Sequence, residues 1–197
     1  MEEYKEARTQ DSEAMTENRK HISKRRRLLV LDFDDTLFFT EEALSLASEE
    51  VFGKRIPVSE IRKMENAVKQ PFYEHTAVKY KEYLKPNGRL IGLSKTLKLK
   101  GYEVIVLSGR HEGQLEETKY SLDLHKIPYK AIILSKKGRT ISNAEWKARA
   151  LSEYIPRYHE ILFFDDDIAN IKFIKKKFAG KNIRFFLVNK RGEREIK

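Results

Sequence analysis

The stretch LLVLDFDDTL, residues 28–37, places three carboxylates directly after an uninterrupted apolar run. The apolar part has the composition of a central strand in a parallel sheet, where both faces are buried. Because alternate residues of a strand point to the same side, Asp32 and Asp34 should face one site while Phe33 turns into the packing. Carboxylates this close repel one another, so their burial requires a compensating positive charge.

The rest of the chain supplies the elements that such a strand needs. Four similar apolar runs follow, at 102–108, 130–135, 160–165 and 183–189. Segments with helical periodicity occur at 90–100, 112–125, 142–155 and 168–178. This alternation predicts an α/β fold, a Rossmann-like parallel sheet of about five strands flanked by helices.

One long segment after the first strand breaks the alternation. Its pattern indicates three helices, punctuated by prolines, at 41–52, 58–69 and 71–84. We therefore expect a small helical cap at 39–86, inserted after strand one into a core domain formed by 27–38 and 87–197. Residues 1–26 mix charged and polar residues without an apolar period, which predicts a flexible, charged N-terminal tail.

The composition narrows the class of protein. The chain has 197 residues, a formal net charge of +10 and no cysteine, which excludes disulfides, thiolate metal sites and cysteine nucleophiles. It has no apolar stretch of the roughly 18 residues that a membrane span needs, and its charged N-terminus is not a secretory signal. We expect a cytoplasmic protein without membrane association, with a nuclear location left open. The basic charge fits contact with nucleic acid, or simply a lysine-rich solvated surface, and the oligomeric state is left open.

Polar residues follow three of the predicted strands where each strand ends. They are Asp32, Asp34, Asp35 and Thr36 after the first strand, Ser108, Gly109 and Arg110 after the second, and Asp165, Asp166 and Asp167 after the fourth. Ligands bind at the carboxyl ends of parallel strands, so these groups should converge on one edge of the sheet. A lone Asp after a strand is usually a turn or helix-cap residue, but two converging acidic clusters favour a hard cation such as Mg²⁺.

Two neighbouring carboxylates can divide the work of phosphoryl transfer. One attacks phosphorus and forms an acyl phosphate, and the other protonates the leaving oxygen and then activates water. A serine followed by a glycine N–H suits the binding of phosphoryl oxygens, and a lysine can neutralise the charge that develops on them. The residue types at this edge therefore indicate phosphate-ester chemistry.

These motifs resemble those of the haloacid dehalogenase-like superfamily of phosphohydrolases. The family's Asp-x-Asp-x-Thr motif reads LLVLDFDDTL here, its strand ending in Ser or Thr reads VIVLSGR, and its final acidic pair reads ILFFDDDIAN. The motifs occur in the family's order, on a scaffold that covers residues 28 to about 190. The resemblance implies a Mg²⁺-dependent phosphatase that forms a covalent aspartyl phosphate.

The resemblance also implies roles for the acidic residues. Asp32 would be the nucleophile, Asp34 the general acid/base, and Thr36 would order their loop. The metal ligands would be Asp32, Asp34 through its backbone carbonyl, Asp166 as the best match to the final acidic motif, and Asp165 as the next candidate. Asn170 stands where the family often has a further Asp, which leaves the outer metal shell open. Asp35 and Asp167 need no catalytic role, and Asp167 would cap the last helix.

The substrate side follows from the same resemblance. Its phosphoryl-binding residues would be Ser108, Gly109, Arg110 and Lys147. We choose Lys147 as the family's lysine because it lies early in the helix after the third strand, near the carboxyl edge of the sheet. Lys136 and Lys137, directly after that strand, are the alternatives.

The segments LSGR, WK and FFDDD further resemble the branch that contains polynucleotide 3′-phosphatase domains. This implies a nucleotide or a nucleic-acid end as the substrate, with another phosphorylated small molecule as the alternative. Basic residues near the C-terminus would line a phosphate-backbone path: Lys172, Lys175, Lys176, Lys177, Lys181, Arg184, Lys190, Arg191 and Arg194.

Two other classes of protein share parts of this pattern. A response-regulator receiver also combines acids, Ser or Thr, Lys and Mg²⁺, but its phosphoacceptor follows the third strand rather than the first. A non-catalytic nucleic-acid-binding module on the same fold is the alternative interpretation. The presence of both Asp32 and Asp34 argues against it.

Overall fold

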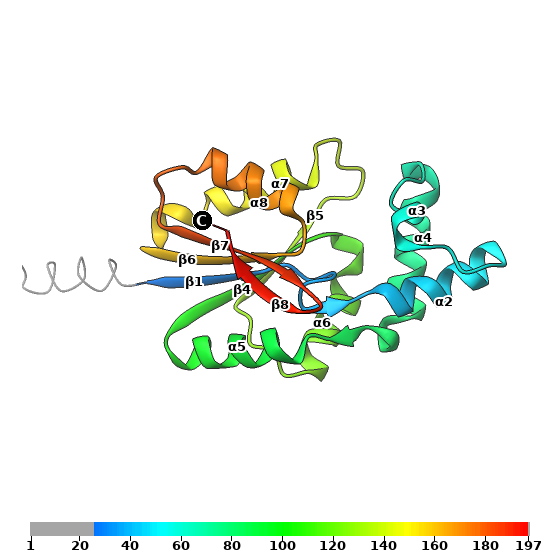
Figure 1. Ribbon diagram of the computed structural model, residues 1–197, viewed down its shortest axis with the longest axis horizontal. Helices are drawn as coiled ribbons and strands as arrows, with labels where there is room; N and C mark the ends of the chain where they lie inside the picture. Colours follow the sequence, from blue (N-terminus) through cyan, green and yellow to red (C-terminus); the bar gives the residue numbers. More distant parts are fainter. Residues whose placement is uncertain (1–25, 197) are drawn as a thin grey trace, which may run out of the picture.

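The computed structural model describes residues 26–196, which are built around one six-stranded sheet (Figure 1). In spatial order its strands are β5 (Ala131–Ser135), β4 (Tyr102–His111), β1 (Arg27–Leu31), β6 (Glu160–Asp165), β7 (Ile183–Asn189) and β8 (Gly192–Glu195). The first five are mutually parallel, and β8 runs antiparallel to β7. The predicted α/β fold with a Rossmann-like sheet is confirmed.

The strand β8 adds one strand to the five that were predicted. Its sequence, GERE, contains no apolar residue, so no hydrophobic pattern marks it. It pairs with β7 in a hairpin, with Asn189 opposite Gly192 and Phe186 opposite Glu195. Main-chain hydrogen bonds to a neighbouring strand therefore form this edge without an apolar run.

Helices cover both faces of the sheet. They are α5 (Gly88–Leu99), α6 (Leu115–Leu124), α7 (Asn143–Ser152) and α8 (Ile168–Lys177). Leu28 and Val30 of β1 share a buried cluster with residues of α7 and α8. Leu29 and Leu31 share the other cluster with residues of α5 and α6. The β1 strand is thus buried on both faces, and Figure 1 shows α5 on the side of the sheet opposite α7 and α8.

The segment after β1 forms a helical unit beyond the carboxyl end of that strand, at the right of Figure 1. Its elements are α2 (Glu41–Phe52), α3 (Val58–Ile61), α4 (Asn66–Lys79) and the 3₁₀ turn η1 (Lys81–Tyr83). A short antiparallel ribbon of β2 (Phe38–Phe39) and β3 (Lys85–Pro86) joins it to the core. It has its own apolar cluster around Leu44, Ile61 and Phe72. Its function as a cap over 39–86 stays a prediction.

The sequence predicts a helix boundary at Pro71, and this is wrong. Pro71 lies inside α4, where it removes one helical N–H donor. The neighbouring side chains of Phe72 and Thr76 are buried, and their packing holds the helix through the proline. The break falls instead at residues 62–65, between α3 and α4.

The other predicted helices match within a few residues. Two of them are shorter than predicted, because 3₁₀ turns stand at their ends: η2 (Glu112–Gln114) before α6 and η3 (Ile155–Arg157) after α7. The predicted charged tail at 1–26 lies outside the described residues except for Arg26. In the described part of the chain, no helix has the length and apolar character to cross a bilayer. The cytoplasmic location stays a prediction.

Candidate active site

The carboxyl ends of β1 and β6 bring three acids together. The two strands pair in parallel with Leu31 opposite Phe164, and the Asp32 N–H donates to the Phe164 carbonyl at 3.0 Å. Asp32 follows Leu31 and Asp165 follows Phe164, so the two acids are neighbours. One carboxylate oxygen from each of Asp32, Asp165 and Asp166 lies within 4.8 Å of the others. The two acidic runs of the sequence thus meet at one edge of the sheet.

Lys147 of α7 lies between two of these acids. Its Nζ is 2.7 Å from Asp32 Oδ1 and 2.6 Å from Asp165 Oδ2, and its side chain is 1% exposed. Burial alone would lower the Lys147 pKa, but the two carboxylates outweigh it and raise the pKa. Burial also raises the pKa of Asp32 well above its usual value, opposed by Lys147 and reinforced by the charges of Asp165 and Asp166.

The alternative lysines lie elsewhere. Lys137 forms an ion pair with Glu74 of α4, 3.0 Å from its Oε1, and Lys136 is exposed. Of the three candidates, Lys147 is the lysine that the structure brings into contact with Asp32. It is close enough to act on a group bound at that carboxylate.

Asp165 and Asp166 have different environments. Asp165 is fully buried and accepts hydrogen bonds from Lys147, from the Asn170 amide at 3.1 Å and from the Asp167 N–H at 2.9 Å. The Asp166 side chain is 22% exposed. Burial raises the pKa of Asp166 to about 7, and the charges of Asp165 and Asp35 add to this. Asp165 is thus engaged by protein donors, while Asp166 is the more accessible of these two candidate metal ligands.

The residues predicted to lie around Asp165 have structural partners. Asn170 donates to Asp165, so an amide suits this position where the family often has an acid. Asp167 caps α8, and its carboxylate accepts from the Ala169 N–H at 2.8 Å. The predicted cap at Asp167 is confirmed.

Asp34 does not belong to this group of three acids, and Arg110 binds its carboxylate. Arg110 Nε is 2.9 Å from Asp34 Oδ2, and Nη2 is 2.8 Å from Oδ1. The guanidinium also stacks on the Phe33 ring, 4.2 Å from its centroid. Phe33 is fully buried, as the strand period predicts. Arg110, expected on the substrate, therefore contacts and orients Asp34 here.

Ser108 and Gly109 lie beside the Asp32 loop on the neighbouring strand. Val106 of β4 pairs with Leu31 of β1, and Ser108 follows two residues later with 1% exposure. A Cβ at Gly109 would come within 2.6 Å of the Asn143 amide oxygen, so the backbone passes close to α7 at this point. Thr36 Oγ1, also buried, lies 3.4 Å from Asp32 Oδ2 and helps to order the loop.

Arg62, a residue that the sequence did not single out, also reaches this edge. Its Nη2 lies 2.9 Å from Asp35 Oδ2 and 3.8 Å from Asp166 Oδ2. Asp35 has a left-handed backbone with φ of 55°, and its Oδ1 accepts from the N–H and hydroxyl of Thr40 at 2.9 Å. Asp35 therefore connects the strand loop to the start of α2 and to Arg62. No motif connects residues 27 positions apart, so only the fold reveals this pair.

The donor set of the cluster fits Mg²⁺. It consists of carboxylate oxygens from Asp32, Asp165 and Asp166, which are the hard ligands that this ion prefers. Mutual repulsion and burial make the cluster unfavourable without added positive charge. Whether the Asp34 carbonyl adds a ligand stays a prediction.

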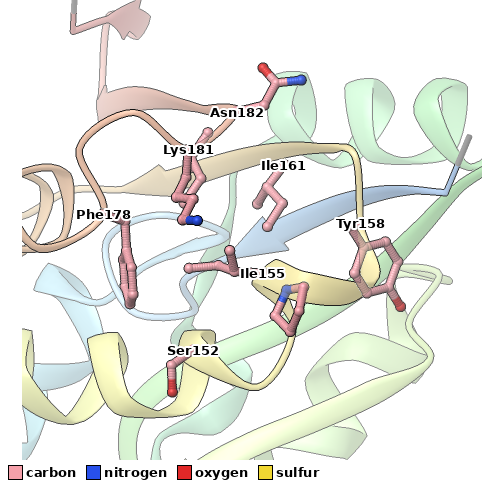
Figure 2. A pocket seen from close by; sticks show the side chains of 9 residues that line it. Ser152, Ile155, Tyr158, Ile161, Phe178, Lys181 and Asn182 are labelled. Carbon is pink, nitrogen blue, oxygen red and sulfur yellow. The ribbon is translucent and has the colours of Figure 1, made fainter. Parts of the chain in front are cut away.

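A separate cavity of about 370 Å³ lies at the opposite edge of the sheet, near the amino ends of β6 and β7 (Figure 2). Apolar residues such as Ile155, Phe178 and Ile161 line it, together with Lys181 and Asn182. Among residues 26–196 no acid lines it, and its residues are not those of the cluster at the carboxyl edge. It is therefore not part of the candidate active site.

Comparisons with known proteins now bear on this arrangement. No protein-family model matches the chain, and no curated protein sequence matches it significantly. Several solved structures do match the chain. A haloacid dehalogenase-like family hydrolase from Streptococcus pneumoniae matches with a TM-score of 0.57 at 12% identity, over 83% of this chain and 84% of that one. The chain has the haloacid dehalogenase-like fold.

Two further matches come from a complex. A chain of the Pnkp1/Rnl/Hen1 complex matches with a TM-score of 0.58 at 19% identity, over 85% of this chain and 46% of that one. A chain of a structure described as the Pnkp1/Rnl/Hen1 RNA repair complex matches with a TM-score of 0.50 at 18% identity, over 84% and 43%. This chain thus spans less than half of the length of either. At these identities the matches show the fold alone.

Proposed function

We propose that the protein is a Mg²⁺-dependent phosphatase that hydrolyses a phosphate monoester through a covalent aspartyl phosphate on Asp32. The observation that carries the proposal is the buried Asp32 carboxylate, in contact with Lys147 and within 4.8 Å of two further acids. A carboxylate oriented by a lysine at a strand's carboxyl end has the surroundings that a nucleophile for phosphoryl transfer needs.

The residues of this chain divide the reaction into two displacements. In the first, an Asp32 oxygen attacks phosphorus, the bond from phosphorus to the leaving oxygen breaks, and Asp34 gives that oxygen a proton. In the second, Asp34 takes a proton from water as the water oxygen attacks phosphorus, which breaks the bond to Asp32 and releases inorganic phosphate. Arg110 holds Asp34 in position through both steps.

The remaining residues stabilise the charge on the transferred group. Lys147 is placed to neutralise phosphoryl oxygens bound at Asp32, and Ser108 with the Gly109 N–H is placed on the neighbouring strand to donate to them. Mg²⁺, when held by Asp32 and Asp166 with Asp165 behind them, would add positive charge at the same oxygens.

For the substrate we propose a nucleotide or a nucleic-acid end. Three features support this class: the net charge of +10, the fold shared with chains of an RNA repair complex, and exposed basic side chains on and after α8. These are Lys172, Lys176, Lys177 and Lys181. Other basic residues of that region are engaged within the protein, since Arg184 pairs with Glu195 and Lys190 with Glu41.

The test is a phosphate-release screen in Mg²⁺ that compares p-nitrophenyl phosphate, nucleotides, sugar phosphates and oligonucleotides phosphorylated at the 3′ or 5′ end. We expect turnover by the wild type and a loss of about 1000-fold or more in Asp32→Asn. We expect no loss in the matched control Asp123→Asn, an exposed acid bound to Tyr129. With p-nitrophenyl phosphate, whose leaving group needs no proton, the Asp34→Asn variant should accumulate acid-stable phosphoprotein, because its second displacement lacks a base.

Failure of the folded protein to release phosphate from every ester in Mg²⁺ would sink the proposal. Selective turnover of oligonucleotide ends would support the narrower substrate class. If Asp32→Asn kept nucleic-acid binding and its biological effect intact, the non-catalytic binding module would be the better interpretation.

A further inference from the structure

Arg62 of the helical unit reaches the acidic edge. It follows α3 directly, and its own N–H donates to the Val58 carbonyl as the cap of that helix. The link between α3 and α4 therefore fixes its backbone, while its side chain extends to Asp35 and Asp166 of the core. The residue thus joins two parts of the fold at the rim of the candidate active site.

The hydrogen bonding of Arg62 leaves donors free. In the described part of the chain, its guanidinium contacts the core through Nη2 alone, and Nε and Nη1 have no partner. A guanidinium has five N–H donors in a planar fork that matches the oxygens of a phosphate. The side chain is 59% exposed, so a ligand at the rim can approach these donors.

The other cations of the site are buried, so they do not extend to a group at the rim as Arg62 does. Lys147 is buried between Asp32 and Asp165. Arg110 is 7% exposed, with two nitrogens on Asp34 and a third 3.4 Å from the Thr118 hydroxyl. Arg62 differs from both in its exposure. It also differs in its closest partner, since Asp35 is neither the proposed nucleophile nor the proposed acid/base.

We propose that Arg62 is a specificity residue that binds a second anionic group of the substrate, a phosphate other than the one that is transferred. This inference rests on the proposed phosphatase function. The exposed ion pair between Arg62 and Asp35 is weak enough to be exchanged for a bidentate phosphate contact. The second phosphate belongs either to a bisphosphorylated small molecule or to the phosphodiester next to a nucleic-acid end.

The position of Arg62 explains why it would bind a second phosphate of the substrate rather than the phosphate that is transferred. The transferred phosphoryl group must lie at Asp32, where Lys147, Ser108 and the Gly109 N–H are available to it. Arg62 contacts acids on the side of the helical unit, where the leaving part of the substrate would lie. A cation at this place contributes binding energy through the remote part of the substrate.

The test compares substrates with one and with two phosphates. The set is p-nitrophenyl phosphate, a nucleoside 3′,5′-bisphosphate and a 3′-phosphorylated oligonucleotide. We expect Arg62→Ala to lower kcat/KM for the two-phosphate substrates about 10- to 100-fold more than for p-nitrophenyl phosphate. We expect Arg62→Lys to lower kcat/KM for the two-phosphate substrates less than Arg62→Ala does, because lysine keeps the positive charge but lacks the parallel donors of the planar guanidinium. The matched control is Arg55→Ala, an arginine of the same helical unit that is 56% exposed and paired with Glu49, and it should leave kcat/KM for these substrates unchanged.

The result decides both the role and the source of the second phosphate. An equal effect on both two-phosphate substrates assigns Arg62 to any second phosphate, and an effect on the oligonucleotide alone assigns it to a phosphodiester. If Arg62→Ala lowers kcat/KM equally for all three substrates, or does not lower it at all, the inference is overturned.

A binding measurement separates this inference from the proposed function. In the Asp32→Asn background, which removes the nucleophile, calorimetry with the nucleoside 3′,5′-bisphosphate should give a Kd raised about 10-fold or more by Arg62→Ala. Absence of turnover in the wild type would defeat the phosphatase proposal, whereas an unchanged Kd would defeat the assignment of Arg62.

Discussion

A Lys147→Met substitution would leave the buried Asp32 and Asp165 without the cation between them. The lysine is 1% exposed and lies 2.7 and 2.6 Å from their oxygens, and the two acids are 7% and 0% exposed. Removing one partner of such a buried pair typically destabilises a protein by about 3–5 kcal/mol, because the remaining charge is desolvated and uncompensated. We expect a loss of this size in metal-free protein at pH 8, measured by urea unfolding followed by circular dichroism.

The loss of folding stability caused by Lys147→Met should depend on pH. Burial already raises the pKa of Asp32 in the folded state, and loss of the Lys147 charge raises it further. A group whose folded pKa is raised favours folding below its unfolded pKa, and this contribution is lost as the pH rises through the folded pKa. The stability difference between variant and wild type should therefore be smaller at pH 5 than at pH 8. Added Mg²⁺ should also reduce it at pH 8.

Two controls make this prediction sharp. Lys136→Met removes an exposed lysine close in sequence and should change stability by less than about 0.5 kcal/mol. The double variant Lys147→Met/Asp32→Asn should be more stable than Lys147→Met alone, since it removes one of the stranded charges. A loss under about 1 kcal/mol, or one of the same size at both pH values, would refute the reasoning.

Three further predictions follow from other contacts of the site. Mg²⁺ should bind about tenfold more weakly at pH 6 than at pH 8 in calorimetric titrations, because the pKa of Asp166 is raised to about 7 and its protonated form is a poor ligand; an affinity independent of pH would contradict this. Gly109→Ala should destabilise the protein by about 1–3 kcal/mol in thermal unfolding, because its Cβ would come within 2.6 Å of the Asn143 amide, and adding Asn143→Ala should restore most of the loss. Arg110→Lys should lower kcat about 10- to 100-fold with little change in KM, because an ammonium cannot hold Asp34 with two parallel donors; an unchanged kcat would exclude a positioning role.

The sheet and the acidic edge could be predicted from sequence because both depend on local patterns. Five apolar runs mark the buried parallel strands, and polar residues at their ends mark the edge where those ends meet. The antiparallel β8 could not be predicted in this way, since its residues GERE contribute main-chain pairing and no apolar surface. The passage of α4 through Pro71 depends on tertiary packing of Phe72, which outweighs a local helix-breaking preference.

The pairing of charges at the site is a further property that sequence does not contain. The contact of Arg110 with Asp34 joins residues 76 positions apart, and that of Arg62 with Asp35 joins two different parts of the fold. Sequence places Arg110 two residues after Ser108 and so suggests a substrate contact. The register of β4 against β5 shifts between Ser108 and His111, and Arg110 in this stretch places its guanidinium on Phe33 and Asp34 of the first strand loop.

These pairings explain how three acids within residues 32–35 can coexist. Each has a cation from a different part of the chain, namely Lys147 of α7 for Asp32, Arg110 of β4 for Asp34 and Arg62 of the helical unit for Asp35. Asp165 shares Lys147, and Asp166 lies 3.8 Å from Arg62, which is closer to Asp35 at 2.9 Å. When all five carboxylates are ionised, they outnumber the three cations by two charges. One divalent ion would balance that difference, and we expect it beside Asp166, which Arg62 approaches no closer than 3.8 Å.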